Sequence, residues 1–84
     1  MTYRYRAHIL DALSEHGLVP EPHTAPQFLR DALNDLYRYE IRRLRNGLIA
    51  GRIPKVHYVS HVIALRKRYL LLSVPLDLWL EPDM

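Results

Sequence analysis

Two of the five histidines in this 84-residue chain, His57 and His61, have the spacing of a metal-binding pair. Side chains four residues apart on a helix share one edge, where two imidazoles could ligate zinc. The positions between them are Tyr58, Val59 and Ser60, so the glutamate of a zinc-protease motif is lacking. The chain also contains no cysteine to complete a site. A lone histidine pair on a polar edge is usually solvent-facing, so we expect no metal and no cofactor.

Three charged residues, Arg6, Glu40 and Arg66, fall on helix faces that are otherwise apolar. Glu40 could serve as a general acid or base, but arginines beside a carboxylate lower its pKa, which does not suit a base at neutral pH. A guanidinium matches a carboxylate in geometry and keeps its charge when desolvated. We therefore predict an internal structural network of Arg6, Glu40 and Arg66. The alternative is that both arginines cover the rim of the core with their charges in water.

No other arrangement of residues indicates catalysis. The sequence has no glycine-rich phosphate loop, no Ser-His-Asp order and no cluster of carboxylates. We therefore do not expect an enzyme.

Helices must position these residues, because apolar side chains recur at intervals of three and four in three segments. The first helix is expected at about residues 3–16, ended by Gly17. The second and longest is expected at residues 24–50, opened by a capping box of Thr24 and Gln27 and ended by Gly51, with a possible kink at Gly47. The third is expected at about residues 55–71.

The last segment of the chain is apolar although Pro75 prevents a regular helix there. We expect an extended segment that packs on the helices or on a partner chain. Its candidate interface residues are Val74, Leu76, Leu78, Trp79 and Leu80. The predicted fold is thus all-α, a single domain over residues 1–84 with three helices, a long central one and an extended apolar C-terminal segment.

Positive charge is concentrated in the middle of the chain, where residues 38–68 contain nine arginines and lysines and one acidic residue, Glu40. Arg38, Arg42 and Arg45 fall along one helix edge, as phosphate contacts would require. The acidic flanking segments could instead fold back onto this basic region. The residues around Gly51 also lack the apolar pattern of a helix-turn-helix. Nucleic-acid binding is therefore the alternative function.

The preferred function is a non-enzymatic helical protein-interaction or regulatory module that associates with itself or with a protein partner. Hydrophobic residues make up 49% of the chain, and so small a domain has limited capacity to bury them. The longest apolar run is too short for a membrane span. No apolar stretch follows the basic N-terminal residues as in a secretory signal. We therefore expect a cytoplasmic location.

Overall fold

The structure, a computed structural model, describes residues 2–82 and is all-α, as predicted. Its helices are α1 (Ala7–Glu15), the long central α2 (Pro26–Ile49) and α3 (Lys55–Arg68), followed by the 3₁₀ turns η1 (Leu70–Ser73) and η2 (Leu76–Trp79). Within these residues β-pairing is limited to an isolated antiparallel bridge between Tyr5 and Leu80. Every helix in the described part of the chain is too short or too polar to span a bilayer.

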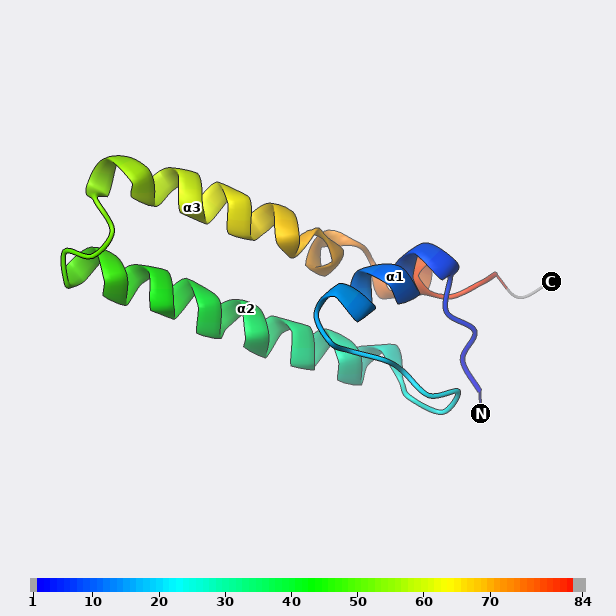
Figure 1. Cartoon of the computed structure of the whole chain (residues 1–84). Helices are drawn as coiled ribbons and strands as arrows, with labels where there is room; N and C mark the ends of the chain where they lie inside the picture. Colours follow the sequence, from blue (N-terminus) through cyan, green and yellow to red (C-terminus); the bar gives the residue numbers. More distant parts are fainter. Residues whose placement is uncertain (1, 83–84) are drawn as a thin grey trace.

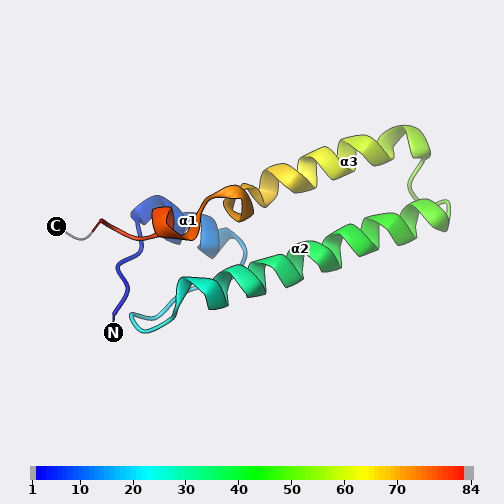
Figure 2. The same cartoon turned by 180° about the vertical axis from the view of Figure 1, so that it is seen from behind.

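Helices α2 and α3 form an antiparallel hairpin, and α1 and the C-terminal turns cover only one end of it (Figure 1). The view from behind shows the same division, with a covered end and a bare end where the chain turns from α2 into α3 (Figure 2). The molecule is consequently elongated, with principal extents of 52 × 17 × 17 Å. We refer below to the covered end and the bare end of the hairpin.

The hydrophobic core lies at the covered end, because only there do more than two segments meet. Its buried side chains come from α1, the first turns of α2, the end of α3 with the residue after it, and the C-terminal turns: Ile9, Leu13, Leu29, Leu33, Leu65, Tyr69, Leu71 and Trp79. Those that lie in α1 and α2 follow the helical spacing of four residues. The apolar periodicity of α3 continues to the bare end, where no third segment covers it.

The helix ends differ from the prediction where long-range contacts intervene. Helix α1 begins only at Ala7, because the preceding residues are extended and the Arg6 amide donates to the Trp79 carbonyl at 3.0 Å. The capping box is wrong, since the Thr24 hydroxyl accepts from the Glu21 amide and Gln27 donates to Asp31. Helix α3 ends at Arg68, where the chain tightens into η1.

Two predicted helix stops are confirmed by backbone conformation. Gly17 and Gly51 have φ of 75° and 77°, in the left-handed region that glycine enters without steric cost. Gly47 neither frays nor ends α2, which continues to Ile49. It is buried against Ile53, and a Cβ added to it would lie 2.8 Å from Ile53 Cδ1. Gly47 therefore permits a close approach between the end of α2 and the following turn.

The C-terminal segment is not extended as predicted, but it does pack on the helices of its own chain. Trp79 is completely buried, and its indole N–H donates to the Val74 carbonyl at 3.1 Å. Val74, Leu76 and Leu80 are half-buried, whereas Leu78 remains exposed. Four of the five candidate interface residues are thus wholly or partly covered within the chain itself.

The covered end is expected to depend on Trp79. Replacing a fully buried tryptophan by alanine removes its packing and leaves a cavity, so Trp79→Ala should lower the free energy of unfolding by about 3–5 kcal/mol. Leu78→Ala in the same 3₁₀ turn is the matched control, because Leu78 is 48% exposed and should cost less than about 1 kcal/mol. Urea denaturation measures both. Equal losses for the two variants would contradict the packing described here.

Candidate functional site

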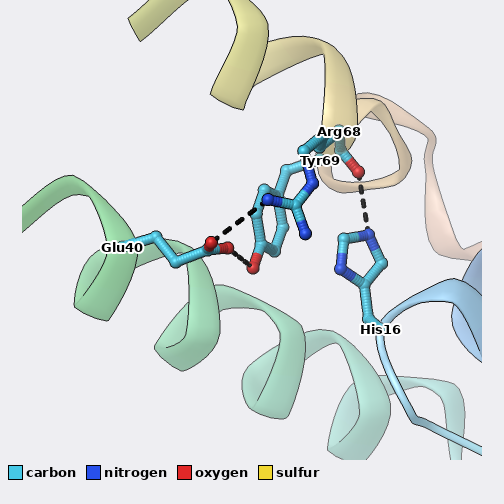
Figure 3. Close-up of polar contacts among 4 residues, drawn as sticks. All are labelled: His16, Glu40, Arg68 and Tyr69. Atoms are coloured by element: carbon cyan, nitrogen blue, oxygen red, sulfur yellow. Dashed lines mark hydrogen bonds and ion pairs between the residues drawn. The ribbon is translucent and has the colours of Figure 1, made fainter. Parts of the chain in front are cut away.

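Glu40 accepts two polar contacts from the end of α3 (Figure 3). The Tyr69 hydroxyl donates to Glu40 Oε2, and Arg68 Nη1 lies 3.3 Å from Glu40 Oε1. The Glu40 side chain is 29% exposed and that of Arg68 is 61% exposed, so this ion pair lies at the surface. Both carboxylate oxygens are nevertheless occupied, which holds α2 and α3 together at the start of the covered end.

Tyr69 is the residue that links this cluster to the core. The centre of its ring lies 4.4 Å from the centre of the His16 ring and 5.2 Å from the centre of the Tyr37 ring, which it meets edge-on. His16 Nε2 lies 2.8 Å from the Arg68 carbonyl, which can only accept, so this nitrogen carries the proton. Burial, followed by the hydrogen bond to Glu40, raises the pKa of Tyr69 to about 12. The phenol therefore stays protonated and acts as a donor, not as a base.

The predicted network of Arg6, Glu40 and Arg66 is not formed. Arg6 Nε instead donates to the Leu80 carbonyl at 2.8 Å, and Arg66 is exposed beside a shallow apolar hollow that includes Tyr37. No charged side chain among residues 2–82 is buried. The apolar face of α3 that contains Arg66 points partly to solvent, which helical periodicity cannot reveal. Removing the Glu40 carboxylate would consequently strand no buried arginine.

A groove of about 480 Å³ runs between α2 and α3 from the Glu40 cluster toward the bare end. Basic side chains surround it: Arg43 from α2, Arg52 from the turn, and His61 and Arg68 from α3. Its apolar lining comes from Leu44, Gly47, Ile53, Ala64 and Leu65, and Glu40 and Asn46 complete it. The Arg43 guanidinium lies 5.9 Å from the centre of the Tyr39 ring. The groove therefore has basic side chains around its opening, which we call the rim, and aliphatic side chains at its base, which we call the floor.

The basic edge predicted on α2 is exposed, since Arg38, Arg42 and Arg45 all face solvent. None of them takes part in an ion pair among residues 2–82. His57 and His61 are also exposed, and no group of three or more potential metal ligands gathers anywhere in the described part of the chain. Only His61 of this pair lines the groove.

An apolar stripe lies on the outer side of α3. Val56, Val59 and Ile63 are 78%, 62% and 48% exposed, and Leu70 follows one heptad after Ile63 with 62% exposure. The spacings of three and four residues put Val56, Val59 and Ile63 on one face of α3, whereas Leu70 lies beyond the end of this helix, in η1. At 3.6 residues per turn, the first three lie about 140–160° around α3 from His61. We call Val56, Val59 and Ile63 the α3 stripe; it faces away from the groove.

Sequence reasoning missed Arg68, Tyr69 and the groove itself. Tyr69 falls within the predicted third helix at residues 55–71, but its hydroxyl gives no periodic signal of a partner on another helix. Arg68 is the last of the nine basic residues in segment 38–68, and its charge alone does not indicate a partner. Comparisons with protein-family models, with curated proteins and with solved structures give no match to this chain, so its function is inferred from its own residues.

Tyr69 should make stability depend on alkaline pH. Its pKa is about 12 in the folded protein against 10.0 unperturbed, so its contribution is complete below pH 10.0 and is lost as the pH rises toward 12. Tyr69→Phe should lower the free energy of unfolding by about 1–3 kcal/mol at neutral pH. That difference from the unmodified protein should shrink between pH 10 and 12. Denaturant titrations across this pH range measure it.

Tyr39→Phe is the matched control, because Tyr39 lies on α2 but is 58% exposed. This substitution should change stability little at any pH. A loss for Tyr69→Phe that stays constant up to pH 12 would show that the hydroxyl does not act as the donor to Glu40.

Proposed function

We propose that this protein is a self-associating helical interaction module in which two hairpins pack through their α3 stripes. The observation that carries the proposal is the row of exposed apolar side chains on α3, toward the bare end of the hairpin. Among residues 2–82, no arrangement of side chains favours catalysis over binding. The occupant proposed for the stripe is a second copy of the same chain.

The surface area of the chain supports association. The accessible surface is 6424 Å², whereas a compact monomer of 9.9 kDa exposes about 5,200 Å². The radius of gyration is 15.5 Å, against about 12 Å for a compact domain of this length. The excess of about 1,200 Å² exceeds the roughly 800 Å² that each partner buries in a standard interface. A second copy at the bare end could remove this excess from water.

The α3 stripe is complementary to itself. If two α3 helices cross antiparallel near Ser60, Val56 of one copy meets Ile63 of the other, and the two Val59 side chains lie at the centre. A twofold interface requires this kind of match. The small Ser60 side chain permits a close approach there. Two antiparallel hairpins packed in this way form a four-helix arrangement, a common solution for amphipathic helices with short connections.

Charge sets the expected salt dependence of this dimer. Helix α3 has no acidic residue, and an antiparallel crossing brings Arg66 and Lys67 of one copy near Lys55 of the other. Salt screens this repulsion while leaving the apolar contact in place. The dimer should therefore become tighter as ionic strength rises from about 0.05 M to about 0.5 M.

Sedimentation equilibrium tests the proposal with Ile63→Glu. Placing a carboxylate against Val56 on each side of the twofold centre of the apolar contact should weaken dimerisation at least about tenfold, which corresponds to about 1.4 kcal/mol. Val19→Glu is the control: Val19 is 80% exposed but lies between α1 and α2, outside the hairpin. A monomeric unmodified protein at high salt, or equal weakening by both variants, would overturn the proposal.

Nucleic-acid binding is the second candidate, favoured by Arg38, Arg42 and Arg45, which are exposed on one edge of α2 and form no ion pair within the described part of the chain. Here salt has the opposite effect, because phosphate contacts release counterions and weaken as salt is added. Replacing the three arginines by glutamine should reduce the slope of log affinity against log salt by about 2–3. Fluorescence anisotropy with DNA and RNA oligonucleotides measures this slope. Absence of binding by the unmodified protein at low salt would exclude this function.

A further inference from the structure

We infer that the groove between α2 and α3 binds a small phosphate monoester, with the phosphate on its arginines and the organic group on its aliphatic floor. The site is separate from the α3 stripe, because His61, which lines the groove, lies on the other side of α3. This inference therefore goes beyond the proposed self-association and does not depend on it.

The charge of the groove fits a dianion. Arg43, Arg52 and Arg68 contribute three positive charges, and Glu40 contributes the single negative one. Both oxygens of that carboxylate already accept contacts, from Arg68 and from the Tyr69 hydroxyl, which limits its repulsion of an anion. The remaining net charge of about two matches a phosphate monoester, which carries about −1.5 to −2 at neutral pH.

The arginines are available to a ligand. Arg43 and Arg52 form no ion pair among the described residues, and Arg43 rests only near the Tyr39 ring. Arg68 engages Glu40 through Nη1, which leaves its other donors free for a second acceptor. They belong to three different elements, α2, the turn and α3, so they approach the groove from separate directions. Planar paired donors of this kind suit phosphate oxygens.

The shape of the groove fits a small organic ligand. A volume of about 480 Å³ lies within the range of small-molecule sites, and an apolar lining with a few polar groups is typical of them. Gly47 keeps the floor open to Ile53, which packs directly against it. The floor is aliphatic, formed chiefly by Leu44, Ile53 and Leu65, so it offers apolar contact without aromatic stacking. It complements the hydrocarbon part of an ester.

Isothermal titration calorimetry of the full chain tests the site with phenyl phosphate as the probe. We expect saturable binding with one site per chain and a dissociation constant below about 1 mM at low salt. Inorganic phosphate, which lacks the organic group, should bind more weakly. Benzyl alcohol, which lacks the charge, should not bind measurably. Equal affinity for phenyl phosphate and inorganic phosphate would overturn the role of the floor.

Arg52→Gln and Arg42→Gln form a matched pair of variants. Both arginines are exposed, so neither change should unfold the protein, but only Arg52 lines the groove. Arg52→Gln should weaken phenyl phosphate binding at least about tenfold, as expected for loss of a charged hydrogen bond. Arg42→Gln should change it less than about twofold. No binding by the unmodified protein, or equal weakening by both variants, would show that the groove is not a phosphate site.

Discussion

The burial of Trp79 is the contact on which the covered end of this protein depends. Its ring is inaccessible to water, its indole nitrogen is bonded to Val74, and its carbonyl accepts from the Arg6 amide. The Arg6 side chain then bonds to the Leu80 carbonyl. The N-terminal segment and the C-terminal turns are thereby held against each other and against α2. Without this contact the chain would retain a two-helix hairpin with little enclosed core.

This arrangement gives the two ends of the hairpin different physical characters. The covered end buries the core, and the Glu40 and Tyr69 contact marks its limit on α2 and α3. The bare end keeps apolar side chains in water on one side and arginines around a groove on the other. Solvated apolar surface on this scale favours association, whereas solvated arginines favour anions. The core and the proposed binding surfaces thus lie on different halves of the same two helices.

The helices could be predicted from the sequence because their periodicity depends on local spacing, and the breaks at Gly17 and Gly51 depend on local backbone conformation. The role of the charged residues could not. Periodicity assigns Arg66 to an apolar face, but whether another segment covers that face depends on the path of the whole chain. The same limit applies to Glu40, whose partner Tyr69 lies far along the sequence. The turns after Arg68 were also missed, since short 3₁₀ elements have no extended repeat.

The contact between Gly47 and Ile53 makes the packing at the base of the groove sensitive to a single position. Any side chain at position 47 would enter the space of Ile53, whose Cδ1 would lie 2.8 Å from the new Cβ. Ile53 lies in the turn that reverses the chain, and its side chain would have to rotate away from the new group. The width of the groove could therefore be altered without changing any of the arginines that surround it. For the phosphate ester proposed above, a substitution at position 47 would change the size of ligand accepted without changing the charge that binds it.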